Sequence, residues 1–312
     1  MSIFSRRKKT ASLTIEEDAI RFVRLKSLDP LIVDVAEEVP LPLNVVADGK
    51  IVDSENLAAI LESHLKPWGI ARRSVQFLAP DSYVIIRKVG YPTDVKEEDL
   101  KGYFFIEIGS TLYLPFDDPV FDVVKYTPST ETNEAIIIAS KESVLAGYEK
   151  VLENVKLDPL VADIAPLALY RLAYAQHRFT GKEHVLIADL QKGKMTVSIF
   201  HEHFPLFMRP VELETSFFPG ASVGDTVPLG SIVGELEKLI NFYRYNLWNG
   251  TASITHILIN GDYVSMNELL QVIRERLDVQ ASTLLKRPLQ LATGQSLPAA
   301  FNRTIGLALK EV

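Results

Sequence analysis

The chain of 312 residues is long enough for two domains, and its 47% hydrophobic and 23% charged residues are ordinary for a globular protein. Its net charge of −7 argues against a nucleic-acid partner, which requires a basic surface. The absence of cysteine excludes disulfides and cysteine zinc sites and fits the cytoplasm, and without an apolar run of about 18 residues we expect no direct membrane insertion.

The first predicted domain comprises residues 11–89 and 158–180 and follows a flexible basic arm at 1–10. Alternating apolar residues predict strands over 12–25 and 31–40, and a polar turn at 48–50 precedes a helix over 54–66 that Pro67 and Gly69 end. Further strands of the same sheet are predicted at 74–78 and 83–89.

Residues 90–157 are predicted to form an α/β subdomain inserted into the first domain. Asp94 and Glu97 have the spacing of a capping box at the start of a helix. That helix carries Leu100, Phe104, Phe105 and Ile108, which we expect on one face. Strands at 120–126 and 135–140 and a helix over 141–155 complete the subdomain.

The second predicted domain comprises residues 181–312, with 213–253 as a smaller subdomain within it. A helix over 158–178, with Pro166 near its first turn, leads into this domain. Helical spacing then indicates a helix over 231–248, followed by a buried strand over 254–259. Ser265 and Glu268 form a second capping box, and a last amphipathic helix is predicted over 298–310.

A strand–turn–strand pattern occurs twice, over residues 13–23 and again over 188–198, at a constant offset of 175 residues. The offset places Thr14 on Asp189, Glu16 on Gln191 and Arg21 on Thr196. A repeat at the start of each half indicates two similar domains that face each other across a cleft. Such a cleft would normally hold a nucleotide.

Three segments, in the same order along the chain, resemble segments of the PilM family, the actin-like proteins of type IV pilus assembly. They are residues 113–122 (YLPFDDPVFD), 157–171 (LDPLVADIAPLALYR) and 305–310 (IGLALK). The resemblance implies an actin-like, ribonuclease H-like α/β fold of two domains, with the inserted subdomain in the first. It also implies a cytoplasmic scaffold for pilus, pseudopilus or competence machinery.

The actin-like superfamily binds phosphate at Asp-x-Gly-[Ser/Thr] turns, and this chain departs from that pattern at each corresponding segment. Thr14 and Glu16 occupy the first turn, so that a carboxylate lies where a phosphate would. A charge pair at about 5 Å costs roughly 3 kcal/mol at an effective dielectric of about 20. The second turn keeps Asp189 and Gly193 but has Gln191 in place of a glycine, and the adenosine segment keeps Gly261 beside Asp262. We therefore expect a degenerate nucleotide site, with at most weak binding of ATP and Mg²⁺.

No catalytic constellation or metal site is predicted, and an assembly protein needs neither. The resemblance implies that the partner is the N-terminal cytoplasmic tail of a PilN-like inner-membrane protein, and it adds the pilus assembly ATPase as a further candidate. In the family this tail lies in the groove between the first domain and its inserted subdomain, so the protein would be recruited to the inner face of the membrane. The candidate contact residues share a position near this groove: Tyr83, Ile85, Arg87, Phe104, Phe105 and Ile108.

Alternatives remain open at the level of sequence. Asp189 could be a metal or general-base residue, but a strand-end acid that caps its own turn is favoured. His201 and His203 could begin a metal site, but no third ligand is evident nearby. An active ATP-binding or hydrolysing member of the sugar-kinase, Hsp70 and actin superfamily is the main alternative function. An FtsA-like division protein is another, although the chain ends without the amphipathic membrane helix usual there.

Overall fold

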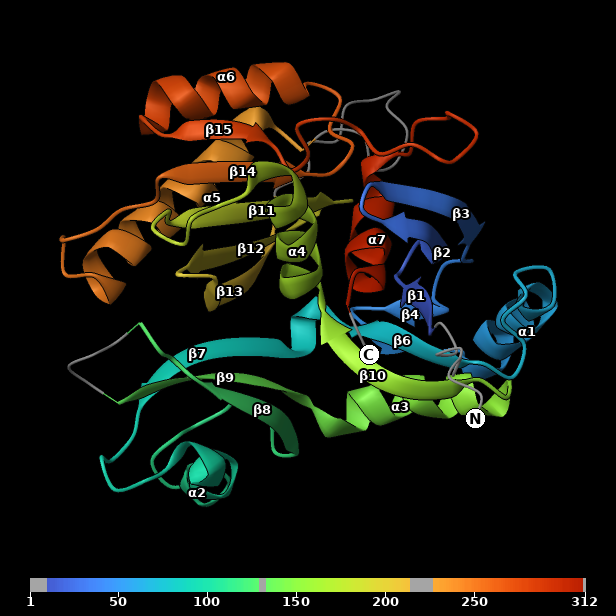
Figure 1. The fold of residues 1–312 in the computed structure, drawn as a ribbon, viewed down its shortest axis with the longest axis horizontal. Helices are drawn as coiled ribbons and strands as arrows, with labels where there is room; N and C mark the ends of the chain where they lie inside the picture. Colours follow the sequence, from blue (N-terminus) through green and yellow to red (C-terminus); the bar gives the residue numbers. More distant parts are fainter. Residues whose placement is uncertain (1–9, 129–132, 214–226, 311–312) are drawn as a thin grey trace, which may run out of the picture.

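A computed structural model describes residues 10–128, 133–213 and 227–310. The predicted basic arm at 1–10 therefore lies outside the described residues except for its last residue. The chain forms two five-stranded sheets and a separate three-stranded sheet, with two helices between the five-stranded sheets (Figure 1). This confirms the predicted two-domain α/β class with an inserted subdomain.

The first sheet has the strand order β10-β6-β1-β2-β3. Its strands are β1 (Ala11–Ile15), β2 (Ala19–Leu28), β3 (Leu31–Pro40), β6 (Ser74–Ala79) and β10 (Asp158–Ile164). Strands β1 to β3 form an antiparallel meander, whereas β6 pairs in parallel with both β1 and β10. A small hairpin of β4 (Val46–Ala47) and β5 (Lys50–Ile51) precedes α1 (Ser54–Leu65), whose N-cap is Asp53.

The second sheet has the order β13-β12-β11-β14-β15, which repeats the order and strand directions of the first. Its strands are β11 (Val185–Gln191), β12 (Lys194–His201), β13 (Phe204–Glu212), β14 (His256–Asn260) and β15 (Gln280–Thr283). Helices α5 (Leu229–Phe242) and α6 (Met266–Leu277) cover one face of this sheet. The predicted smaller subdomain at 213–253 does not have a core of its own among the described residues, because α5 packs into the core of the second sheet.

The inserted subdomain is a sheet of β7 (Val84–Gly90), β9 (Glu134–Lys141) and β8 (Pro119–Lys125), with α2 (Leu100–Glu107) on one face. The other face packs against the second domain through Val84, Ile86 and Ile136. Residues 83–89 were predicted in the first sheet, and this was wrong because β7 pairs with β9. The sheet membership therefore changes near Asp81 instead of at residue 90.

Helix α3 (Glu142–Asn154) also departs from the predicted domain bounds. It was assigned to the insert, but Tyr148, Val151 and Leu152 are buried in the core of the first domain together with α1. Its amphipathic pattern shows that one face is buried but cannot show which sheet buries it. The insert proper thus comprises residues 81–141, and 142–157 belong to the first domain.

The predicted helix over 158–178 was wrong over residues 158–164, where β10 pairs in parallel with β6. Helix α4 (Ala165–His177) has Pro166 in its first turn, as predicted. The predicted capping box at Asp94 does not start a helix either, because α2 begins only at Leu100 after the short turn Glu97–Asp99. Ser265 does precede α6, although its side chain makes no capping hydrogen bond.

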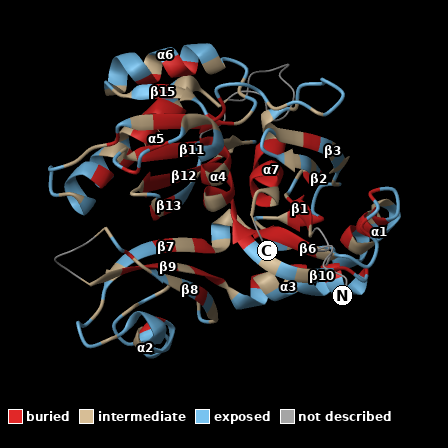
Figure 2. Ribbon diagram, in the orientation of Figure 1, coloured by how far each residue is buried: buried red, intermediate tan, exposed pale blue. Residues whose placement is uncertain are grey.

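Helices α4 and α7 (Asn302–Ala308) pack against each other between the two five-stranded sheets (Figure 1). All seven residues of α7 except Ala308 are buried, as its colouring in Figure 2 shows. Gly306 makes this contact possible, because a Cβ built there would lie 2.1 Å from the carbonyl oxygen of Ala168. Although 181–312 was predicted as the second domain, α7 contacts β1, β2 and β6 of the first.

Candidate functional site

Two strand–turn–strand units face each other at the centre of the molecule. Thr14 pairs with Arg21 across the first unit, and Asp189 pairs with Thr196 across the second. The predicted offset of 175 residues maps each pair on the other, so the repeat is structural. The amide Nε2 of Gln191 lies 3.4 Å from Oε1 of Glu16, the residue at the equivalent position of the first unit.

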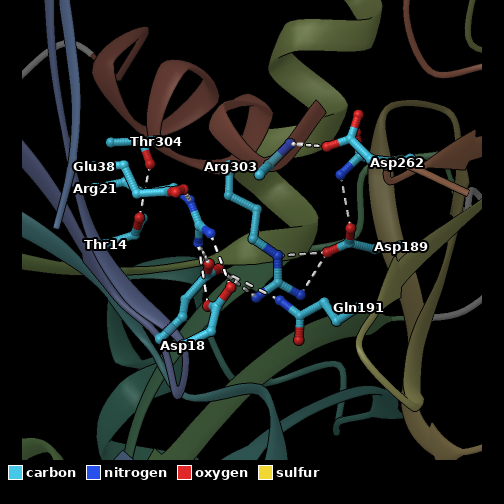
Figure 3. A network of polar contacts seen from close by, with 12 residues as sticks. Thr14, Asp18, Arg21, Glu38, Asp189, Gln191, Asp262, Arg303 and Thr304 are labelled. Carbon is cyan, nitrogen blue, oxygen red and sulfur yellow. Dashed lines mark hydrogen bonds and ion pairs between the residues drawn. The ribbon is translucent and has the colours of Figure 1, made fainter. Parts of the chain in front are cut away.

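Arg303, from the first turn of α7, places its guanidinium between the two units (Figure 3). Its Nε donates to Asp189 Oδ2 at 2.5 Å, and its Nη2 donates to Asp81 Oδ2 at 2.6 Å. Its Nη1 lies 3.2 Å from Glu16 Oε1, and turning the Gln191 amide would allow its oxygen to accept from the same guanidinium. The Arg303 side chain is only 9% exposed, so one cation joins both halves in a nearly dry site.

A second arginine holds the first turn. Arg21 forms ion pairs with Glu16, with Asp18 at 3.0 Å and with Glu38 at 2.6 Å, and its side chain is 5% exposed. Lys194 at the start of β12 reaches across to Glu17 at 2.9 Å. The acidic first turn is therefore fixed by cations from both domains.

Carboxylates outnumber arginines at this site. Five of them surround two guanidinium groups, and they are Glu16, Asp18, Glu38, Asp81 and Asp189. Burial raises the pKa of both Glu16 and Asp189 above the ordinary value, although Arg303 opposes this. Burial alone would lower the pKa of Arg303, but its carboxylate neighbours raise it, so that the guanidinium stays charged. One oxygen of Asp81, Oδ1, is buried without a hydrogen-bond partner, whereas its Oδ2 also accepts from Thr196 at 2.7 Å.

The other predicted cleft residues contact the segment before α7 or α7 itself. Thr14 Oγ1 lies 2.7 Å from Thr304 Oγ1, and Asp262 accepts from the amides of Ala299 and Ala300 at 3.0 and 3.1 Å. Gly261 has φ +123°, and a Cβ there would lie 2.5 Å from the carbonyl oxygen of Leu190. The lack of a side chain at Gly261 thus permits its backbone to approach β11 closely.

Asn260 and Asn302 extend the network between α7 and the second domain. Asn302 donates to Asn260 at 2.7 Å, and Asn260 donates to Asp189 at 2.7 Å. Gly193 lies in the second turn with φ 69° and accepts the amide of Leu213 at 2.9 Å. The structure therefore brings Thr14, Glu16, Asp189, Gln191 and Asp262 to one place, with Gly193 and Gly261 supporting its backbone.

Sequence reasoning missed Arg303, Asp81 and Asn302. The helix of α7 was expected to be amphipathic, and in such a helix a charged residue is normally assigned to the solvent face. The run Asn302-Arg303-Thr304 directly before an apolar segment was the available signal. It becomes informative only once both faces of α7 are known to be buried.

The six predicted partner-binding residues do not form one surface. Phe104 is buried at 2% exposure, whereas its neighbour Phe105 is 75% exposed, so they cannot share a helix face. Ile85 and Arg87 lie on β7, where Arg87 donates to the carbonyl of Tyr113 at 2.7 Å. Ile108 ends α2 and packs on the core of the insert, and Tyr83 packs on the first domain.

A pocket of about 250 Å³ lies in the first domain where it meets the last residue of the insert. It is lined by Lys50 and Ile51 of β5, Lys141 at the end of β9, and Ser143, Val144 and Gly147 of α3. Tyr83 is adjacent, because Lys50 Nζ lies 5.6 Å from the centre of its ring. Of the predicted partner-binding residues, Tyr83 is thus the one that contacts a residue of this pocket.

The histidines considered as metal ligands make other contacts. His203 Nδ1 lies 2.9 Å from the hydroxyl of Tyr170, and His201 stacks on His184 with ring centres 3.9 Å apart. Across residues 10–128, 133–213 and 227–310, no three His, Asp or Glu side chains are arranged to hold a metal ion. None of the helices in this described part is long and apolar enough to cross a membrane.

Two five-stranded sheets of the same topology with two helices between them, and an insert in the first half, define an actin-like two-domain protein. The model of the type IV pilus assembly protein PilM matches residues 13–217, and the chain belongs to this family. The structure of a PilM–PilN type IV pilus biogenesis complex is similar over 97% of this chain and 98% of that one, with a TM-score of 0.77 and 18% identity.

A second solved structure has the same fold. It is the cytoplasmic domain of EpsL, an inner-membrane component of the type II secretion system of Vibrio cholerae, with a TM-score of 0.51 and 14% identity. The match covers 97% of this chain and 96% of that one. No curated protein sequence matches this chain.

Proposed function

We propose that this chain is a cytoplasmic scaffold of a pilus or pseudopilus machine that binds the N-terminal tail of a PilN-like inner-membrane protein without catalysing a reaction. Membership of the PilM family carries this proposal. The likeness to a chain solved as a PilM–PilN complex supports the choice of partner. Binding of such a tail would recruit the protein to the inner face of the membrane.

The pocket of the first domain beside Lys141 is the proposed docking place. Its lining includes Gly147, which lies in the middle of α3, where glycine costs about 1 kcal/mol relative to alanine. A Cβ built at Gly147 meets nothing within 4 Å, so packing within this chain does not require the glycine. We infer that the space it leaves accommodates a side chain of the tail.

The lining indicates what that side chain and its neighbours are. Ile51 and Val144 offer apolar surface, and burial of apolar area contributes about 25 cal/mol per Å². Micromolar affinity corresponds to about 8 kcal/mol, so the tail must also bury apolar surface outside the pocket. Lys50 and Lys141 also line the pocket and are donors for oxygen atoms of the tail. The proposed tail therefore places an apolar side chain in the pocket and turns carbonyl or carboxylate oxygens to the two lysines.

The test is calorimetric titration with a synthetic peptide of the N-terminal tail of the PilN-like protein from the same organism. Gly147→Leu fills the pocket, and Gly102→Leu is its matched control, since Gly102 is also helical and also has nothing within 4 Å of an added Cβ. We expect micromolar binding to the native protein and the control, and binding at least about tenfold weaker to Gly147→Leu.

Two results would count against this proposal. Absence of binding at hundreds of micromolar would contradict the choice of partner. Loss of binding in Gly102→Leu but not in Gly147→Leu would instead place the tail on α2, near the exposed Phe105, and would show that the wrong surface has been chosen.

The charge of the cleft supports a scaffold that acts without nucleotide. Arg303 lies between the two turns, where phosphates would be bound, and it pairs with the three carboxylates of Glu16, Asp81 and Asp189. A triphosphate placed there would face these carboxylates at short range, at roughly 3 kcal/mol for each unscreened pair at about 5 Å. This charge supports the proposal that the site has at most weak affinity for a nucleotide and its metal ion.

Thermal shift and hydrolysis assays with Mg-ATP test this second part. We expect no change in melting temperature and no phosphate release for the native protein or for Asp189→Ala. Hydrolysis that Asp189→Ala abolishes would instead favour an active ATPase of the actin superfamily and contradict a role as scaffold alone.

A further inference from the structure

We infer that Arg303 binds the carboxylates of both domains and holds the domains together. Its guanidinium thereby takes the place of a cation bound from solution. This goes beyond the proposed function, which concerns what the protein binds, because it concerns what fixes the two domains relative to each other. Four observations carry it: the contacts of α7, the convergence of carboxylates, the burial of the guanidinium and the unpaired oxygen of Asp81.

Helix α7 makes hydrogen bonds to both domains. Towards the first domain, Thr304 contacts Thr14, and the carbonyl of Leu307 accepts from Gln76 at 2.9 Å. Towards the second domain, Asn302 contacts Asn260 and Arg303 contacts Asp189. Successive residues at the start of one helix thus bind opposite halves of the molecule, so the two halves cannot separate without breaking contacts of α7.

Arg303 is the residue of α7 that forms ion pairs with both halves at once. Glu16 and Asp81 belong to the first half and its insert, whereas Asp189 belongs to the second. A planar guanidinium with five N–H donors can serve three carboxylates in different directions, which a lysine ammonium cannot do with the same geometry. The site is therefore specific for a guanidinium and not only for positive charge.

Two of the three carboxylates around Arg303 depend on it for their ion pair. Glu16 is also paired with Arg21, but Asp189 and Asp81 have ion pairs only with Arg303 among the described residues. Asp81 Oδ1 is buried without a partner, so this carboxylate already lacks part of its solvation. Without Arg303 the acids of the two halves would repel each other at short range, and the cleft would open or admit another cation.

The experiment measures the distance between the domains. Because the chain has no cysteine, Glu62→Cys on α1 and Asn267→Cys on α6 provide two exposed sites for spin labels, one in each domain. Pulsed electron resonance should give one narrow distance distribution for the labelled protein. Arg303→Ala should broaden it about twofold and shift it to longer distances, as expected when a second, open state becomes populated.

Chemical rescue distinguishes loss of the Arg303 ion pairs from a general loss of folded structure. Millimolar methylguanidinium should restore the narrow distribution in Arg303→Ala, whereas methylammonium should not, and Arg303→Lys should remain broad. Arg276→Ala is the matched control, because Arg276 pairs with an exposed Glu237 on the surface and contacts nothing in the cleft. Its distribution should be unchanged.

An unchanged distribution in Arg303→Ala would overturn the inference, and so would rescue by Mg-ATP, because that would show a cleft still suited to nucleotide. If Arg303→Ala does not fold even with methylguanidinium, Asp189→Asn decides, since it removes one charge of the bridge and keeps the shape of the side chain. A narrow distribution in that variant would also overturn the inference. Binding of the tail peptide is measured separately, so failure of the inference about Arg303 and failure of the proposed function remain distinguishable.

Discussion

The two halves of the molecule follow one plan and differ at the places that would carry chemistry. In each half, three antiparallel strands are followed by helix, strand, helix, strand and helix. The first half runs β1 to β3, α1, β6, α3, β10 and α4, and the second runs β11 to β13, α5, β14, α6, β15 and α7. The insert at 81–141 interrupts the first half between β6 and α3. The comparison teaches that the sheets preserve the plan, whereas the turns and insertions distinguish the halves.

The cleft shows the same contrast at the level of single residues. The first turn carries Glu16 and Asp18, held by Arg21, where the second carries Gln191 and a glycine at 193. Helices α4 and α7 occupy equivalent places in the two halves and pack on each other, but only α7 sends a charged side chain into the cleft. The asymmetry therefore depends on very few side chains within a symmetric frame.

The largest expected effect comes from breaking the contact between the two equivalent helices. Gly306→Ala places a Cβ 2.1 Å from the carbonyl oxygen of Ala168, a backbone atom of α4 that cannot move alone. We expect the free energy of unfolding to fall by about 3 kcal/mol or more. Urea denaturation measures it, and Gly102→Ala, where space is open, should change stability by less than about 1 kcal/mol. A small effect of Gly306→Ala would mean that α4 and α7 can separate without cost.

Next in size is the difference between two residues that occupy the same register position in the two halves. Arg21→Met leaves Glu16, Asp18 and Glu38 without their shared cation and should cost about 3 kcal/mol of unfolding free energy. Thr196→Val removes only its hydrogen bond to Asp81 and should cost about 1 kcal/mol. Equal costs in urea denaturation would contradict the view that Arg21 contributes through its charge and Thr196 only through one hydrogen bond.

The sheets and most helices could be predicted from the sequence because apolar periodicity reports burial directly. Apolar periodicity could not show against which other helix or strand the apolar face of an element packs. Residues 83–89 alternate as a strand must, but their pairing with β9 depends on contacts made some 50 residues later. The partners of α3 and α7 are hidden for the same reason.

The candidate site was predictable in part. Thr14, Glu16, Asp189 and Gln191 lie at equivalent positions of the two units, as the repeat predicts, because a turn residue keeps its place when both flanking strands are identified. Arg303 is distant from all of them in sequence, and no local pattern distinguishes a buried arginine from an exposed one on a helix. Only the fold brings it to the turns.

A third expected effect concerns a pair of histidines in the second half. His184 stacks on His201, and its Nδ1 lies 2.6 Å from the hydroxyl of Tyr243. Burial, and to a lesser extent His201, lower the pKa of His184 to about 4 from its ordinary value of 6.5. By the offset of 175 residues, Lys26 of β2 stands where His201 stands, so the first half has a different residue at this position.

The sign of the pH dependence follows from the lowered pKa. The folded state favours neutral His184, so its contribution is fully present above about pH 6.5 and is lost as the pH falls towards about 4. Because the ring is only partly buried, we expect about 2 kcal/mol over this range after allowance for solvent screening. Urea denaturation between pH 7 and 5 should show a steeper loss of stability for the native protein than for His184→Gln. Parallel curves would show that this histidine does not cause the acid sensitivity.

The smallest expected effect is a gain. Helix α3 contains Gly147, whereas its counterpart α6 contains no glycine. Gly147→Ala adds a methyl group to open space and removes the entropic cost of glycine in a helix, so it should stabilise the protein by about 0.5–1 kcal/mol in urea denaturation. The same methyl group enters the pocket, so the tail peptide should bind more weakly to the more stable variant. Higher stability together with weaker peptide binding would show that Gly147 contributes to binding of the partner at a cost to stability.

If Gly147→Ala lowers stability instead, α3 itself needs the glycine, and the main reason to place the tail in this pocket is lost.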